Sequence, residues 1–205
     1  MRRATGSKSL AATKKVSIQL ALDGHSFSVS GVTAETVTPE GAPLEVEVLT
    51  PRTLLVPAAL YREETAGAML AAAGMPAAAD DAIVRSEERD GVVAVMAAGR
   101  EAIEAVRASV PVGVRFTTPL LEPLDGDVPA VRCRVTAGIA YIKIWNDGLR
   151  MAEAVPAATE EDLLCLFERL GEAFVLREYR LCLAGDEACR LRRLLKNRFK
   201  EIVCE

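Results

Sequence analysis

The chain has 205 residues, of which 50% are apolar and 26% are charged, and its formal net charge is −4 at pH 7. This length fits one large domain or two domains of about 100 residues each, and the apolar content excludes general disorder. No uninterrupted apolar run of about 18 residues occurs, which argues against a membrane-spanning helix. The acidic balance argues against a nucleic-acid-binding protein that depends on its overall charge.

Residues 1–15 are polar, small and positively charged. They have the charge of a secretory signal but lack its apolar core, so we expect a disordered leader in a cytoplasmic protein. The five cysteines are interpreted as reduced core residues, because most lie in apolar segments and their number is odd. They are Cys133, Cys165, Cys182, Cys189 and Cys204. With a single histidine, His25, and no Cys-x-x-Cys pair, the sequence does not favour a zinc site.

The first half of the chain begins with alternating apolar and polar residues from Val16 to Leu22, which predict a half-buried strand. Asp23-Gly24 predicts a turn, after which Phe27 and Val29 return along a second strand. A third strand is predicted over residues 44–48, and we interpret the three as an antiparallel meander. The following elements are a helix over 58–73 that begins at Pro57, short strands near 83–84 and 92–96, a helix over 101–109 and a strand over 112–116.

The second half gives the clearest pattern. Strands are predicted over 131–136, 139–145 and 149–155, then a helix capped by Thr159, a strand over 181–185, a helix over 187–198 and an edge strand at 202–204. The Pro- and Gly-containing residues 119–129 are the predicted crossing between the halves. Each half therefore has the order strand, strand, strand, helix, strand, helix, over residues 16–120 and 130–205, which predicts an α/β fold with two mixed sheets.

This repeated order is similar to that of the two ribonuclease-H-like lobes of actin-like ATPases, which hold a nucleotide between them. Four segments also resemble, in the same order, an uncharacterised bacterial family, a domain of unknown function from Bacteroidota with the actin-like ATPase fold. They are residues 16–24, 55–57, 145–146 and 183–185. The resemblance implies a duplicated fold but no reaction, because that family has no established activity.

The resemblance also implies where a nucleotide would bind. Asp23, Gly24 and Ser26 resemble a first phosphate loop, whereas Gly138 lies in a second turn without a carboxylate. Gly185 stands alone where a glycine pair is expected. Since two of the three sites are degraded, we expect an interaction or scaffold protein without a cofactor, whose partner is another protein. The alternative is a nucleotide-binding or weak ATPase module that holds ATP and Mg²⁺ at these five residues in a cleft between the lobes.

Cations are concentrated in the closing helix, opposite an apolar stripe. They are Arg190, Arg192, Arg193, Lys196, Arg198 and Lys200. Such a helix fits contact with an anionic membrane or with nucleic acid. We favour a core helix with a solvated outer face, because cations are stabilised near a helix C-terminus, and the acidic chain without interleaved aromatic residues argues against nucleic acid.

Overall fold

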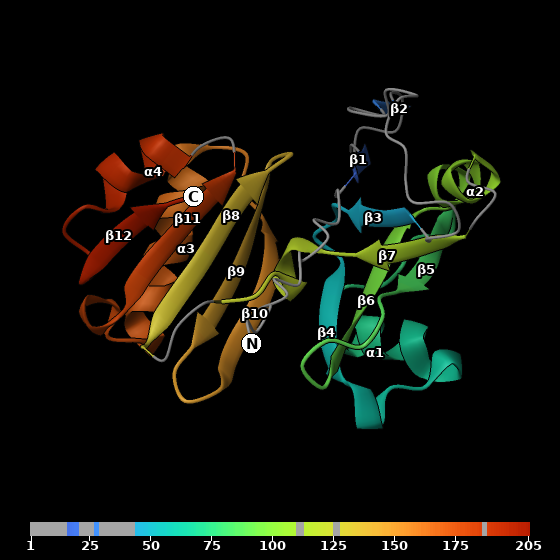
Figure 1. The fold of residues 1–205 in the computed structure, drawn as a ribbon, viewed down its shortest axis with the longest axis horizontal. Helices are drawn as coiled ribbons and strands as arrows, with labels where there is room; N and C mark the ends of the chain where they lie inside the picture. The colour runs from blue at the N-terminus through green and yellow to red at the C-terminus, as the bar shows by residue number, and fades with distance from the viewer. Residues whose placement is uncertain (1–15, 21–26, 29–43, 110–112, 125–127, 186–187) are drawn as a thin grey trace, which may run out of the picture.

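The computed structural model describes residues 16–20, 27–28, 44–109, 113–124, 128–185 and 188–205. Its strands form three sheets with five, four and three strands. Figure 1 shows the five-stranded sheet on one side of the molecule and the other two sheets on the opposite side. The predicted leader and the turn that contains Asp23 lie outside the described residues. No helix within the described ranges is long and apolar enough to cross a membrane.

The five-stranded sheet has the strand order β10-β9-β8-β11-β12. Its elements are β8 (Ala130–Thr136), β9 (Ile139–Trp145), β10 (Leu149–Pro156), α3 (Glu160–Ala173), η4 (Leu176–Glu178), β11 (Arg180–Gly185), α4 (Ala188–Leu195) and β12 (Glu201–Cys204). Strands β8, β9 and β10 are antiparallel neighbours, while β11 and β12 are added parallel to β8. The element order and the edge strand predicted for the second half are confirmed, but the helix predicted over 187–198 is shorter, because α4 ends at Leu195.

One face of this sheet carries the larger core. Alternate residues of β8 and β9, such as Cys133 and Ile142, pack against the apolar stripes of α3 and α4, such as Phe167 and Leu191. Burial of each such large side chain stabilises the fold by about 1.5–3 kcal/mol. Both helices therefore cover the same face of the sheet, and the opposite face is left for other contacts.

The four-stranded sheet has the order β2-β1-β3-β7. Its strands are β1 (Val16–Leu20), β2 (Phe27–Ser28), β3 (Leu44–Val48) and β7 (Val114–Thr117). The predicted antiparallel meander is wrong at its third strand, because β3 runs parallel to β1, with Val16 opposite Val46. A two-residue period identifies a strand but carries no information about its direction.

The three-stranded sheet, β4-β6-β5, is a departure from the predicted order. It contains β4 (Thr53–Pro57), β5 (Asp81–Arg85) and β6 (Val92–Gly99), which are antiparallel. We predicted Pro57 as a helix start, whereas it ends a fourth strand. The predicted helix over 58–73 is divided into the short turns η1 (Ala58–Leu60) and η2 (Glu63–Thr65) and the helix α1 (Ala66–Ala72). Helix α2 (Arg100–Ser109) agrees with the prediction.

The free face of the five-stranded sheet contacts elements from the first half of the chain. The short turn η3 (Pro119–Leu121) lies in the predicted crossing segment, and its Leu120 is buried. Leu120 packs with Leu49, Ile139 and Tyr141 in a small core of its own. This contact places the end of β3 opposite β8 and β9.

Candidate functional site

The structure describes two of the five residues predicted to hold a nucleotide. Asp23, Gly24 and Ser26 lie outside the described residues, as does His25. Gly138 follows β8 in the turn to β9, and Gly185 ends β11, where it lies opposite Val135 of β8. Because β8 and β11 are parallel, both glycines lie at the same end of the five-stranded sheet.

Each of these glycines has a structural reason to be glycine. Ala137 and Gly138 both have positive φ angles, 51° and 68°, as the two central residues of this kind of hairpin turn require. Gly185 has a φ of 91°, and a Cβ atom there would lie 2.2 Å from the carbonyl oxygen of Val135. Neither position therefore needs a nucleotide to explain it.

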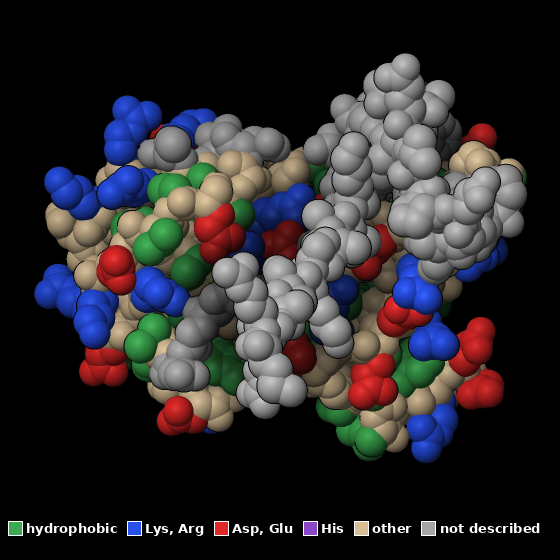
Figure 2. Space-filling model, viewed as in Figure 1, with side chains coloured by type: hydrophobic (Ala, Val, Ile, Leu, Met, Phe, Trp, Pro, Cys, Tyr) green, Lys and Arg blue, Asp and Glu red, His purple; other side chains and the backbone are tan. Residues whose placement is uncertain are grey.

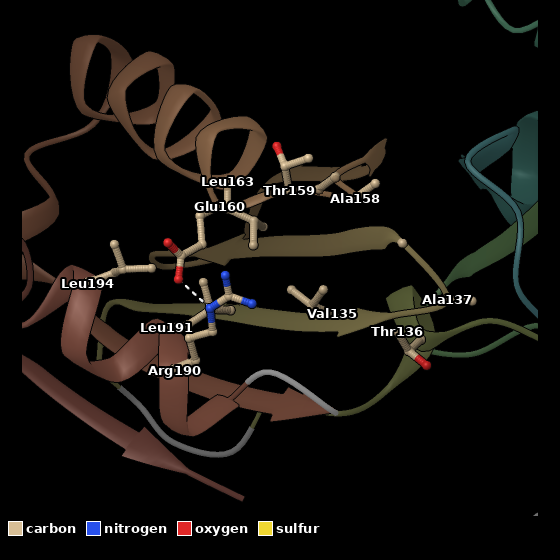
Figure 3. A pocket seen from close by; sticks show the side chains of 12 residues that line it. Val135, Thr136, Ala137, Ala158, Thr159, Glu160, Leu163, Arg190, Leu191 and Leu194 are labelled. Carbon is tan, nitrogen blue, oxygen red and sulfur yellow. Dashed lines mark hydrogen bonds and ion pairs between the residues drawn. The ribbon is translucent and has the colours of Figure 1, made fainter.

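A cavity of about 180 Å³ lies beside the Gly138 turn, between the N-terminal end of α3 and α4 (Figure 3). Its lining is partly apolar, with Leu163 from α3 and Leu191 and Leu194 from α4. Glu160 of α3 and Arg190 of α4 also line it and form an ion pair with each other. Ligand pockets usually measure about 300–1,000 Å³, so this cavity is small for a nucleotide.

The N-terminal end of α3 carries its own negative charge. The Thr159 hydroxyl accepts a hydrogen bond from the Asp162 amide at 3.2 Å, and the Thr159 amide donates one to the Asp162 carboxylate at 3.0 Å. These hydrogen bonds lower the pKa of Asp162. Glu160 and Glu161 lie in the same first turn. A helix N-terminus attracts phosphate through free amides and a positive dipole end, and here acidic side chains counter both.

A second group of polar side chains lies between the sheets, and we call it the charge cluster. It consists of Glu47, Glu122, Arg132, Arg134, Lys143 and Glu205. Arg134 of β8 donates to both carboxylate oxygens of Glu47 on β3, at 2.9 and 2.8 Å, and to Glu122 at 2.5 Å. Arg132 contacts Glu122 and Glu205, and Lys143 donates to the backbone carbonyl of Glu122.

Burial sets the electrostatics of this cluster. Glu47 is only 3% exposed. Burial by itself would lower the pKa of Arg134, but the charges and hydrogen bonds of Glu47 and Glu122 outweigh burial and raise that pKa above its usual value. Burial, with the nearby charge of Arg132, lowers the pKa of Lys143. The cluster is thus a set of paired charges rather than an exposed acid or base.

Sequence reasoning missed the charge cluster. It assigned one buried face to β8, whereas Arg132 and Arg134 on the other face are also largely covered. The alternating arginines of β8 and the alternating Glu45 and Glu47 of β3 are visible in the sequence. Their pairing is not visible, because it depends on how two distant sheets face each other.

The described residues do not form a recognisable catalytic constellation. No three His, Cys, Asp or Glu side chains among them are arranged to hold a metal ion. Cys133, Cys165, Cys182 and Cys204 are free, and Cys165 is exposed, which differs from the core position predicted for it. Burial raises the pKa of Cys133 to about 12, which keeps this thiol protonated and unreactive near neutral pH.

No protein-family model matches the chain, and neither does any curated protein. Among solved structures, the chain is similar to a protein from Bacteroides thetaiotaomicron described as having an actin-like ATPase fold and unknown function. The TM-score is 0.65 and the identity 15%, and the match covers 80% of this chain and 68% of the other. The predicted actin-like ATPase fold is thereby confirmed, and at this identity the likeness shows the fold alone.

Proposed function

We propose that this chain is a non-catalytic interaction or scaffold protein that keeps an actin-like fold while its phosphate loops have degenerated. In this proposal the chain needs no cofactor, and its partner is another protein rather than a membrane or a nucleic acid. The two mixed sheets are two copies of one ribonuclease-H-like unit, over residues 16–120 and 130–205.

The strand pairings support a duplicated unit. In the order β2-β1-β3-β7 the successive pairs are antiparallel, parallel and parallel. The order β9-β8-β11-β12 has the same succession. The three-stranded sheet is then an insertion between β3 and β7 of the first copy.

The observation that carries the proposal is the charge beside the Gly138 turn. A nucleotide phosphate placed there would meet Glu160 and the self-capped N-terminus of α3, and the cation that lines the cavity, Arg190, is already paired with Glu160. Phosphate binding normally needs amides and cations that are available to the ligand. In the described part of this end of the sheet, the helix N-terminus is capped by acidic side chains and the cation is already paired.

The charge cluster supports the proposal independently. Arg132, Arg134 and Lys143 lie on the sheet face that meets the first half, and carboxylates or a carbonyl of the protein hold these three cations. A ligand phosphate would have to displace these buried interactions. Buried ion pairs between the two halves fit a protein whose halves stay in contact and whose outer surfaces bind partners.

Calorimetric titration with ATP and Mg²⁺ tests the proposed function. We expect no saturable heat for the wild-type chain. Micromolar binding that Asp23→Ala abolishes, and that Asp80→Ala at an exposed site leaves unchanged, would overturn the proposal. That result would support the alternative, a nucleotide-binding or weak ATPase module that uses Asp23, Gly24, Ser26, Gly138 and Gly185.

A further inference from the structure

The end of the chain is strongly cationic in an otherwise acidic protein. Residues 188–200 contain six Lys or Arg residues and no Asp or Glu. Arg190 and Arg198 pair with Glu160 and Glu168 of α3. Arg192, Arg193 and Lys196 are exposed and form no ion pair with any residue that the structure describes. Figure 2 shows Lys and Arg side chains gathered over α4 and beside β12.

The apolar side chains of residues 188–200 are buried against the rest of the protein. Leu191 and Leu195 are each 1% exposed and Phe199 is 7% exposed, because they pack on the five-stranded sheet. An interfacial helix binds a bilayer by burying its apolar face in the lipid. Arg192, Arg193 and Lys196 are therefore available to a partner, whereas the apolar side chains are not, and insertion into a membrane does not fit.

Arg192 lies on a particular flank of α4. Successive residues of an α-helix are rotated by about 100°, so Arg192 lies about 200° around the axis from Arg190. Arg190 faces α3, where Glu160 holds it. Arg192 therefore lies on the flank away from α3, which faces the outer edge of the five-stranded sheet, where β12 lies. The exposed Lys196 follows in the turn directly after α4, which ends at Leu195.

Strand β12 has an unpaired outer edge in the described part of the chain, because it is the last strand of its sheet. The Glu205 amide donates to the Leu183 carbonyl of β11 at 2.9 Å. Backbone groups of a strand alternate between its two neighbours, so the amides of Ile202 and Cys204 point to the free edge. Such an edge is a template for another strand.

The charges around the free edge of β12 determine what kind of strand can pair with it. Two copies of this chain paired edge to edge would bring two cationic segments together, so a homodimer through β12 is disfavoured. We infer that the free edge of β12, Arg192 of α4 and Lys196 in the turn after α4 together bind an extended acidic segment of another protein as an added strand. This inference rests on the interaction role proposed above and names a partner class for it.

The two faces of the sheet specify a pattern for the added segment. On the α4 face, its side chains meet Arg192 and Lys196 and are expected to be acidic. On the other face β12 presents Val203, which is 38% exposed, between Glu201 and Glu205. Acidic side chains on that face would be repelled, so apolar ones are expected. The predicted ligand therefore alternates acidic and apolar residues.

Fluorescence anisotropy with a labelled Glu-Val-Glu-Val-Glu-Val-Glu peptide tests the charge requirement. We expect saturable binding that weakens with added salt, and no binding of the corresponding Lys-Val peptide. The double variant Arg192→Glu, Lys196→Glu is expected to bind at least about tenfold more weakly, as the loss of two charge contacts predicts. The matched control Arg62→Glu, Arg150→Glu makes the same change in net charge at exposed sites away from β12, and binding should be unchanged.

The variant Cys204→Pro tests strand pairing, because proline removes an amide that points to the free edge and is tolerated on edge strands. We expect at least a tenfold loss of peptide binding with an unchanged circular dichroism spectrum. A peptide with proline in place of each valine makes the same test from the ligand side, should the variant unfold.

Equal binding by Cys204→Pro and by the proline peptide would overturn the inference, as would an equal loss in the control double variant. Binding of duplex DNA or phosphatidylserine vesicles that matches the acidic peptide, and that Arg192→Glu, Lys196→Glu abolishes, would assign this surface to nucleic acid or lipid instead. None of these outcomes changes the nucleotide titration, so the inference and the proposed function fail separately.

Discussion

Arg134 of β8 binds both carboxylate oxygens of Glu47, a residue 87 positions earlier on β3, at 2.9 and 2.8 Å. This bidentate pair joins the five-stranded sheet to the four-stranded one. Glu122, in the crossing segment between the halves, contacts the same guanidinium. The ion pairs of Arg134 and the apolar contact around Leu120 therefore lie together at the boundary between the two halves.

Breaking this pair on one side should cost much more than removing it entirely. We expect Glu47→Leu to lower the free energy of unfolding by about 3 kcal/mol, because it leaves a largely buried guanidinium with Glu122 alone. The double variant Glu47→Leu, Arg134→Leu should recover most of this loss. Urea denaturation measures both. Arg169→Leu, which breaks an exposed pair with Glu153, is the control and should cost less than about 1 kcal/mol. Equal losses for Glu47→Leu and Arg169→Leu would contradict the account.

Tyr141→Phe should stabilise the fold. The Thr50 backbone is close enough to the buried Tyr141 hydroxyl to lower its pKa, but no described residue has the geometry of a hydrogen bond to this hydroxyl. Removal of an unsatisfied buried hydroxyl should raise the free energy of unfolding by about 1 kcal/mol. A loss of more than that amount in urea denaturation would show that the hydroxyl is satisfied.

The same residue predicts a pH dependence. Burial, and then the charge of Glu47, raise the pKa of Tyr141 above its usual value. The folded state therefore holds this proton more tightly than the unfolded state, and stability should fall as pH rises above about 10. Tyr141→Phe should reduce that fall, relative to the wild-type chain, between about pH 9 and about pH 11, on either side of the usual tyrosine pKa of about 10. An identical fall in the variant and the wild type would contradict the assignment.

Two glycine substitutions separate structural roles from ligand roles. Gly138→Ala should cost about 1 kcal/mol, because alanine is strained at this positive φ but has room for its Cβ atom, 3.8 Å from Ala158. Gly185→Ala should cost several times as much, because its Cβ atom would collide with the Val135 backbone. Thermal unfolding monitored by circular dichroism ranks the two. Equal, small losses would mean that Gly185 is not required by strand packing.

The contribution of the Thr159 cap of α3 to the free energy of unfolding should be measurable by itself. Thr159→Ala removes the hydroxyl that accepts from the Asp162 amide and should cost about 1 kcal/mol in urea denaturation. Thr159→Ser keeps an acceptor and should remain near wild type. If alanine and serine were equally stable, the hydroxyl would not be the capping group.

Much of the second half could be predicted because its signals are local. The alternation from Val131 to Val135, the turn at Gly138 and the cap at Thr159 each depend on neighbouring residues, and the structure confirms all three. The first half was predicted less well for the same reason. Nothing local shows that β3 runs parallel to β1, or that the apolar residues before Pro57 form a strand of a separate sheet.

The residues of the candidate site also differ in whether the sequence could point to them. Gly138 and Gly185 were identified as nucleotide-site candidates from the resemblance to actin-like ATPases, and backbone geometry accounts for a glycine at both positions. Glu47 and Arg134 looked like ordinary polar residues of half-buried strands. Their pairing across 87 positions arises only when the two halves are in contact, so no sequence period could reveal it.

The central claim is that the chain keeps an actin-like fold without binding nucleotide. The most direct measurement is a two-dimensional ¹H–¹⁵N spectrum of the labelled protein during titration with ATP and Mg²⁺, with the amides of Gly138 and Gly185 as reporters. We predict that both signals keep their positions up to millimolar nucleotide, a range about a thousandfold above micromolar affinity. Saturable shifts of these two amides at micromolar nucleotide would contradict the claim.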